Sequence, residues 1–131
     1  LQPGDVFVAV AARAPCKDAD MLVDNMLIAR TMAKALKSSR VSHVVNISSD
    51  AVYADSPDAL TEASCASPGT MHGVMHLARE VMLATEQAAP LAILRPSLLY
   101  GASDPHNGYG PNRFRRLAAR GEDIVLFGVA C

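Results

Sequence analysis

The chain has 131 residues, of which 50% are hydrophobic, a length and composition typical of one domain with a buried core. Its 12 basic and 13 acidic residues give a formal net charge of −1, which argues against nucleic acid or an anionic membrane as a partner. Apolar runs fall short of the roughly 20 residues of a membrane span, and no basic n-region with an apolar h-region opens the chain. The three cysteines lack C-x-x-C spacing, so we expect a cytoplasmic protein with reduced thiols.

The first two predicted elements are a strand and a long helix. Residues 5–12 form a short apolar run with β-branched side chains, which favours a buried strand. From Asp18 onward, apolar residues recur every three or four positions, and Asp18 or Asp20 can cap the helix that this spacing predicts. The helix should end near residues 38–39.

The stretch from Val44 to Tyr53 is the most informative in the chain. An apolar β-branched run ends there in the hydroxyls of Ser48 and Ser49 and the carboxylate of Asp50. In parallel α/β sheets, ligands bind at the carboxyl ends of the strands. The stretch therefore predicts a buried strand that opens into a polar site.

A loop over residues 54–69 leads to a second predicted helix and a third strand. Thr70 can cap the helix, and Pro90 interrupts it before the strand at residues 91–94. The spacing predicts that one apolar stripe of this helix faces the core. The stripe consists of Met71, Val74, Met75, Ala78, Val81 and Met82.

The last third of the chain adds a loop over residues 97–111, a basic helix over 112–120 ended by Gly121, and a strand over 124–127. Strands and helices thus alternate along the whole chain. Parallel neighbours in a sheet need crossover connections, so this alternation predicts an α/β fold with a parallel sheet and helices on its faces.

Several short motifs, in this order and at these spacings, resemble the extended short-chain dehydrogenase/reductases, also called the NAD-dependent epimerase/dehydratase family. Each motif is weak alone, and their combination carries the resemblance. The matching pieces are Asp24-Asn25, Ser48 to Tyr53, Leu60-Thr61-Glu62, Gly73 to Glu80, Ile93 to Pro96, Leu99-Tyr100-Gly101, Pro111 to Phe114 and Leu126-Phe127-Gly128.

The resemblance implies a Rossmann-like domain that is incomplete in this chain. The family's Gly-x-x-Gly-x-x-Gly turn, which receives the cofactor pyrophosphate, is not among the eight glycines. By resemblance, the chain begins near the family's fourth strand, and residues 97–131 begin the substrate-binding region. The parent protein is then expected to use NAD or NADP for hydride transfer on a nucleotide sugar or similar hydroxylated substrate, as an epimerase, dehydratase or reductase, with homodimerisation a further expectation.

The family's catalytic set is a strand-end Ser or Thr, a Tyr, and a Lys four residues after the Tyr. Ser49, four residues before Tyr53, matches the strand-end hydroxyl. The other two positions depart from the pattern, because His72 stands in the Tyr place and His76 in the Lys place. His72 would then be the acid/base on the substrate oxygen and His76 would lie near the cofactor ribose, since a neutral imidazole can pass a proton near neutral pH.

Three other interpretations of these histidines stay open. The pair can be surface or core packing, or a relic in a non-catalytic family member that binds nucleotide or a protein partner. His72, His76 and Glu80 also share one helical face at spacings that a metal ion could use, although the Glu of a His-Glu-x-x-His site is replaced by Gly73.

The remaining candidates each have a functional and a structural interpretation. Asp50 is a catalytic acid/base by resemblance, or a turn-forming residue. The resemblance also places Ala11, Asn25, Pro96 and Ser97 at the cofactor, whereas Asn25 could instead bond the backbone and Pro96 could end the strand. Asn112 and Phe114 match a sugar-nucleotide contact region or are a helix cap and a core aromatic, and Arg113, Arg115 and Arg116 could meet a diphosphate or form a solvated face.

Overall fold

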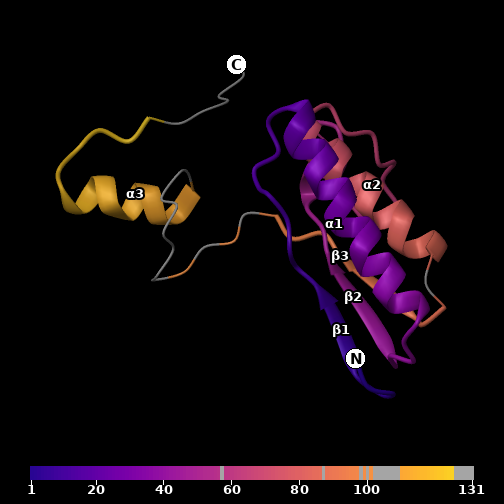
Figure 1. The fold of residues 1–131 in the computed structure, drawn as a ribbon. Helices are drawn as coiled ribbons and strands as arrows, with labels where there is room; N and C mark the ends of the chain where they lie inside the picture. The colour runs from indigo at the N-terminus through magenta and orange to yellow at the C-terminus, as the bar shows by residue number, and fades with distance from the viewer. Residues whose placement is uncertain (57, 87, 98, 100, 102–109, 126–131) are drawn as a thin grey trace. The chain divides into compact units, whose positions relative to one another are not determined.

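In the computed structural model, the chain consists of two compact units, Leu1–Ser97 and Leu98–Cys131. The structure describes residues 1–56, 58–86, 88–97, 99, 101 and 110–125. The first unit contains the strands β1 (Val6–Ala9), β2 (His43–Ile47) and β3 (Leu91–Leu94), the helices α1 (Ala19–Lys37) and α2 (Met71–Glu86), and the 3-10 turn η1 (Asp50–Val52), and the second contains α3 (Gly110–Ala119) (Figure 1).

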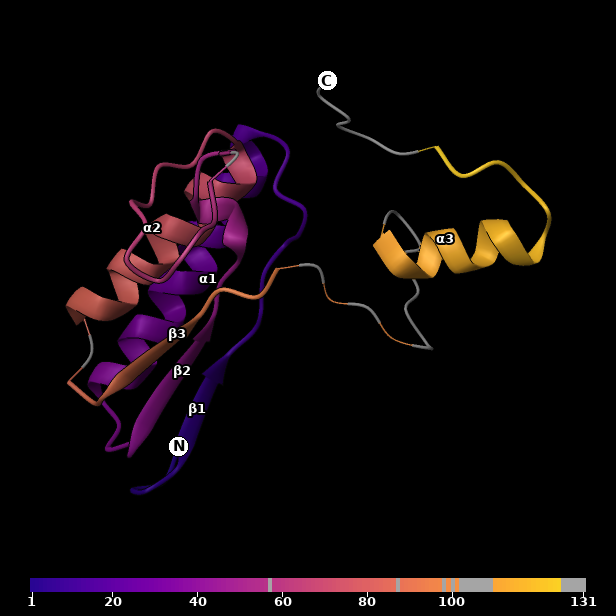
Figure 2. The same ribbon diagram turned by 180° about the vertical axis from the view of Figure 1, so that it is seen from behind.

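The three strands of the first unit form a parallel sheet in the order β1-β2-β3. Val45 of β2 is paired with Val8 on one side and with Ala92 on the other. Helices α1 and α2 connect these strands and both cover the same face of the sheet (Figures 1 and 2). The predicted parallel α/β fold is confirmed.

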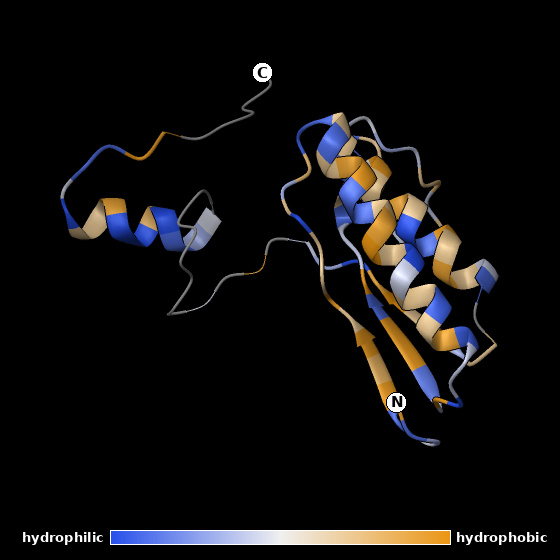
Figure 3. Cartoon of the chain, in the orientation of Figure 1, coloured by the Kyte–Doolittle hydropathy of each residue, from blue (hydrophilic) through white to orange (hydrophobic). Residues whose placement is uncertain are grey.

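The core lies between the sheet and the two helices. Ala9 and Val44 from the sheet pack there with Ala33 and Leu36 of α1 and Leu83 of α2. The other face of the sheet is apolar as well, and Figure 3 shows the hydrophobic colour of β1. Val6 and Val8 on that face are 57% and 50% exposed, so within the described residues helices cover one face of the sheet.

Helix α1 follows its predicted pattern closely. Asp18 is the N-cap and its carboxylate accepts a hydrogen bond from the Met21 N–H at 2.8 Å. Asn25, Ala29 and Ala33 are buried, at spacings of four residues. None of the helices in the described part of the chain is long and apolar enough to cross a membrane.

Helix α2 buries a different face from the one its apolar residues predict. Met71, Val74 and Val81 of the predicted stripe are exposed, and of that stripe only Met75 is fully buried. Hydropathy misplaces the face because Glu80 on it receives hydrogen bonds from Ser48 and Arg95, which follow β2 and β3. The buried residues of α2 are Gly73, Met75, His76, Arg79, Glu80 and Leu83.

The second unit confirms the predicted basic helix, which begins two residues earlier, at Gly110. Gly121 follows the helix at a φ of +66°, a left-handed conformation typical of a glycine that ends a helix. Ile124 and Val125, expected in a final strand, are not in a strand, and the rest of that strand, at 126–127, lies outside the described residues. That residues 97–131 begin a substrate-binding region stays a prediction.

Candidate functional site

The candidate site lies at the carboxyl ends of β2 and β3, which continue side by side beyond the strands. The Ser48 N–H donates to the Leu94 carbonyl at 2.7 Å, and the Asp50 N–H donates to the Pro96 carbonyl at 3.2 Å. These bonds hold the predicted Asp50 next to the predicted cofactor segment at Pro96 and Ser97. An open cleft of about 730 Å³ lies here, lined by Asp50, Tyr53, Leu60, Thr61, Glu62, Ile93, Leu94, Arg95, Pro96 and Ser97.

Ser49 and Asp50 form a small hydrogen-bonded unit where β2 ends. The Ser49 hydroxyl accepts from the Ala51 N–H at 3.2 Å and donates to the Asp50 carboxylate at 3.1 Å. Ser49 thereby caps η1, and Asp50 begins that turn. The hydroxyl has a capping role, and it is also aligned with a carboxylate that could receive its proton.

Gly73 lets the start of α2 approach this turn. A Cβ at Gly73 would collide with the Ala51 carbonyl oxygen and would come within 2.7 Å of the Pro68 Cβ. Only a residue without a side chain permits this contact. The close approach brings the neighbouring His72 within electrostatic range of Asp50.

His72 is half-buried and held from two sides. Its Nδ1 accepts a hydrogen bond from the Cys16 backbone N–H at 3.3 Å, and its ring packs edge-on against the ring of His76, with 4.7 Å between centroids. Burial lowers the pKa of His72, and the negative charge of Asp50 offsets only part of that effect. The imidazole is therefore neutral near neutral pH.

His76, which stands in the family's Lys place, is 8% exposed. Burial is the main cause that lowers its pKa to about 4, and the neighbouring His72 and Arg79 lower it further. Its Nδ1 is buried and has no hydrogen-bond partner among the described residues. His76 therefore supplies no positive charge at neutral pH, unlike the Lys that it replaces.

A closed cluster of polar side chains joins α2 to the ends of β2 and β3. Glu80 receives the Ser48 hydroxyl at 2.5 Å, the Arg95 Nε at 3.0 Å and the Arg95 Nη2 at 2.7 Å. Arg95 also donates from Nη1 to the Tyr53 hydroxyl at 2.7 Å and lies 5.0 Å from the Tyr53 ring centroid. The hydrogen bond to Glu80 is the main cause that raises the pKa of Arg95.

This cluster bears on the proposed metal site of His72, His76 and Glu80. Both carboxylate oxygens of Glu80 accept hydrogen bonds from Arg95. Within the described part of the chain, no group of three His, Cys, Asp or Glu residues is arranged to hold a metal ion. The structure gives the metal interpretation no support.

Arg79, next to Glu80, is buried with few partners. Its Nη2 donates to the Ala9 carbonyl at 3.4 Å and to the Asn46 Oδ1 at 3.5 Å. Its Nε and Nη1 and the Asn46 Nδ2 are buried without a partner in the described residues. Burial lowers the pKa of Arg79.

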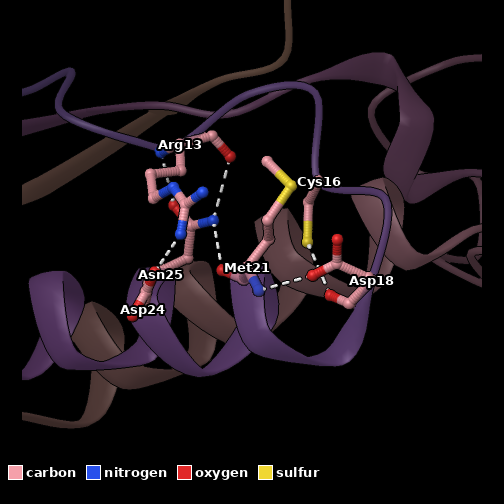
Figure 4. Close-up of polar contacts among 6 residues, drawn as sticks. All are labelled: Arg13, Cys16, Asp18, Met21, Asp24 and Asn25. Carbon is pink, nitrogen blue, oxygen red and sulfur yellow. Dashed lines mark hydrogen bonds and ion pairs between the residues drawn. The ribbon is translucent and has the colours of Figure 1, made fainter.

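Asn25 bonds the backbone of the loop after β1, which was the structural interpretation of this residue. Its amide oxygen accepts from the Arg13 N–H at 2.9 Å, and its Nδ2 donates to the Arg13 carbonyl at 3.0 Å and the Met21 carbonyl at 2.8 Å (Figure 4). Arg13 also forms an ion pair with Asp24. Asn25 thus fixes the loop that contains the predicted cofactor residue Ala11, which is exposed.

The structure brings together only some of the predicted site residues. Ser49, Asp50 and His72 meet where η1 contacts α2, and Pro96 and Ser97 line the cleft beside Asp50. Asn112 and Phe114 belong to the second unit, where Asn112 is buried and its Nδ2 donates to the Gly101 carbonyl at 2.7 Å. Sequence reasoning missed Cys16 and the cluster of Ser48, Tyr53, Glu80 and Arg95. The only sequence signal for this cluster was the recurrence of polar residues on one face of α2.

Comparison with known proteins agrees with this fold. The model of the NAD dependent epimerase/dehydratase family matches residues 5–130. No protein among curated sequences matches the chain.

Solved structures of sugar-nucleotide enzymes share the fold. A UDP-N-acetylglucosamine 4-epimerase from Methanobrevibacter ruminantium, in complex with UDP-N-acetylmuramic acid, has a TM-score of 0.81 at 21% identity over 95% of this chain and 44% of its own. A UDP-glucuronic acid 4-epimerase from Bacillus cereus, in complex with UDP-glucuronic acid and NAD, has a TM-score of 0.78 at 21% identity over 95% and 42%. A UDP-N-acetylglucosamine 4-epimerase from Bacillus cereus has a TM-score of 0.74 at 26% identity over 92% and 44%. The chain spans less than half the length of these structures.

Proposed function

Because the chain belongs to the NAD dependent epimerase/dehydratase family, we propose that the protein transfers hydride between NAD or NADP and a nucleotide sugar, as an epimerase, dehydratase or reductase. The observation that carries this proposal is the family match over residues 5–130. The solved neighbours that hold UDP-glucuronic acid or UDP-glucose together with NAD support the same substrate class and cofactor.

The residues of this chain fit one end of such a cofactor. Ala11 and Ser97 are exposed and follow β1 and β3 at the carboxyl edge of the sheet, where parallel sheets bind ligands. We assign Ala11, Pro96 and Ser97 to the nicotinamide end of the cofactor. The nicotinamide would supply a hydride acceptor when the cofactor is bound. Asn25 acts on this end by holding the loop, and contact of His76 with the ribose stays a prediction. No residues here fit the pyrophosphate, since the chain has no Gly-x-x-Gly-x-x-Gly turn.

The oxygen on the substrate carbon that is oxidised is assigned to Ser49 and His72. Both lie where η1 contacts the start of α2, beside the cleft. The resemblance offers two groups for the proton of that oxygen, the imidazole of His72 and the carboxylate of Asp50. Asn112 and Phe114 are assigned to the sugar nucleotide by resemblance alone.

The proposal is tested by turnover of the full-length protein with NAD+ or NADP+ and a series of UDP-sugars. Ser49→Ala should lower turnover about 100-fold, because a hydrogen bond to the reacting oxygen is lost. Ser38→Ala, which removes a hydroxyl at the end of α1, serves as the matched control and should not change it. Unchanged turnover in Ser49→Ala would show that the assigned site is wrong.

We also propose that two copies of the protein associate through the outer face of α1 and α2. Val23 and Leu27 on α1 and Val74 and Val81 on α2 are exposed at helical spacings, so the described residues of the first unit leave an apolar surface on these helices uncovered. Val81→Glu should shift the mass measured by analytical ultracentrifugation from dimer to monomer. A wild-type protein that sediments as a monomer at micromolar concentration would contradict the association.

A further inference from the structure

The hydrogen bond between Cys16 and His72 fixes which imidazole nitrogen carries the proton. A backbone N–H can only donate, so the Nδ1 of His72 that receives it must present a lone pair. In the neutral ring the hydrogen then resides on Nε2. His72 therefore has an N–H to offer at Nε2 and no free lone pair there with which to accept a proton.

The donor of this hydrogen bond is itself held in place. Cys16 is buried, and its Sγ is 3.8 Å from the Asp18 carbonyl at the N-terminus of α1. Asn25 holds the same loop through both backbone groups of Arg13 (Figure 4). The loop cannot turn the Cys16 N–H away without breaking contacts on both of its sides.

A proton acceptor, the Asp50 carboxylate, lies within electrostatic range of His72. The Asp50 carboxylate is near enough to influence the imidazole and accepts the Ser49 hydroxyl at 3.1 Å. It is exposed to the cleft at the strand ends. His76 packs against His72 with its ring edge and brings no charge at neutral pH.

We propose that His72 is a neutral hydrogen-bond donor to the substrate oxygen through its Nε2–H, and that Asp50, not His72, takes up the substrate proton. Cys16 is then a positioning residue, which acts through the tautomer of His72. The inference rests on the proposed function and divides the roles within that site.

With these roles, the hydride and the proton released in the oxidation of a substrate hydroxyl each have an acceptor. The C–H bond breaks and its hydrogen leaves as hydride to the nicotinamide, while the O–H proton passes to Ser49 as Ser49 gives its own proton to Asp50. The carbonyl oxygen that forms accepts a hydrogen bond from the Nε2–H of His72, which keeps its proton throughout. In the return reaction Asp50 gives the proton back through Ser49.

The tautomer is measured directly by NMR of protein labelled with 15N at histidine. We expect the His72 Nε2 to show the shift of a protonated nitrogen and Nδ1 that of an unprotonated one, both in the wild type and in Cys16→Ala, which keeps the backbone N–H. Cys16→Pro removes that N–H and should give a mixture of tautomers. If this variant does not fold, Asn25→Ala, which releases the loop, should also produce a mixture. A wild-type His72 protonated at Nδ1 would overturn the proposal.

The division of roles is measured by turnover of the full-length protein. His72→Gln retains an N–H donor and should lose about tenfold, whereas Asp50→Asn keeps the shape but not the base and should lose 100-fold or more. The reverse ranking would overturn the assignment of Asp50. If the wild type transfers no hydride, the proposed function fails, while the NMR result still decides the tautomer of His72.

Discussion

Arg79 and Glu80 are adjacent residues of α2 that are almost equally buried, at 1% and 3% exposed, yet their surroundings differ. Every hydrogen bond of Glu80 comes from a fixed donor, the Ser48 hydroxyl or the Arg95 guanidinium. Among the described residues, Arg79 has as acceptors only the carbonyl of Ala9 and the amide oxygen of Asn46, both at 3.4 Å or more, and no carboxylate. Within the part of the chain that the structure describes, Glu80 has a counter-charge and Arg79 has none.

The two residues therefore differ in what they contribute to the fold around the candidate site. The Glu80 cluster ties α2 to the ends of both strands that carry Asp50 and Pro96, and so fixes where the cleft lies. Arg79 is on the same helix as His76, and its charge helps to hold the pKa of that imidazole low. Buried charges are costly unless they are paired, so the Arg79 guanidinium should lower the stability of the fold.

Removing the charge of Glu80, which is paired with Arg95, should have the largest effect on stability. Glu80→Gln leaves the Arg95 guanidinium without its counter-charge and should lower the free energy of unfolding by about 3–5 kcal/mol. Chemical denaturation of the variant measures this loss. Glu86→Gln is the matched control, because Glu86 on the same helix pairs with Lys37 at the exposed surface, where a pair contributes about 0–1 kcal/mol. Equal losses in the two variants would refute the comparison.

Acid should lower the stability of the fold through the buried imidazole of His76. The pKa of His76 is about 4 in the folded protein against 6.5 ordinarily, so between these values the unfolded chain binds a proton that the folded chain does not. Stability is then full above pH 6.5 and falls as pH drops toward 4, by roughly 3 kcal/mol at the acid end. His76→Leu should flatten this pH dependence, while His43→Gln, at an exposed histidine of β2, should leave it. Equal slopes in the wild type and His76→Leu would contradict the assignment.

Removing the unpaired charge should have a smaller effect of opposite sign. Arg79→Met keeps much of the side-chain length and removes the buried guanidinium, so the free energy of unfolding should rise by about 2 kcal/mol. Thermal and chemical unfolding measure the change. Arg30→Met, at an exposed position on α1, controls for the loss of a positive charge and should change little. A loss of stability in Arg79→Met would mean that Arg79 has a stabilising partner.

The same contrast explains how far the sequence could predict the fold. Local signals were sufficient for α1, where the apolar spacing and the cap at Asp18 lie within a few residues of each other, and for the strands β2 and β3. The alternation of strands and helices was sufficient for the parallel pairing. The buried face of α2 was predicted wrongly. Its charges meet partners 15 residues away, at Arg95, and 70 residues away, at Ala9, and no spacing rule within the helix reports such distant partners.

The candidate site shows the same limit. The strand end at Ser49 and Asp50 could be recognised because hydroxyls and a carboxylate stop an apolar run. The Cys16 N–H that fixes His72 could not, because it is a backbone group 56 residues away and any amino acid except proline provides it. The roles assigned to His72, His76 and Asp50 stay predictions that variants must test.

Hydride transfer from a labelled substrate tests the central claim most directly. A UDP-sugar carrying deuterium at the carbon to be oxidised is mixed with the full-length protein and oxidised cofactor, and the nicotinamide is recovered after denaturation and examined by mass spectrometry. The account predicts reduced cofactor that contains deuterium, in an amount that Asp50→Asn lowers 100-fold or more within the same time. Bound UDP-sugar and cofactor with no deuterium in the nicotinamide would contradict it.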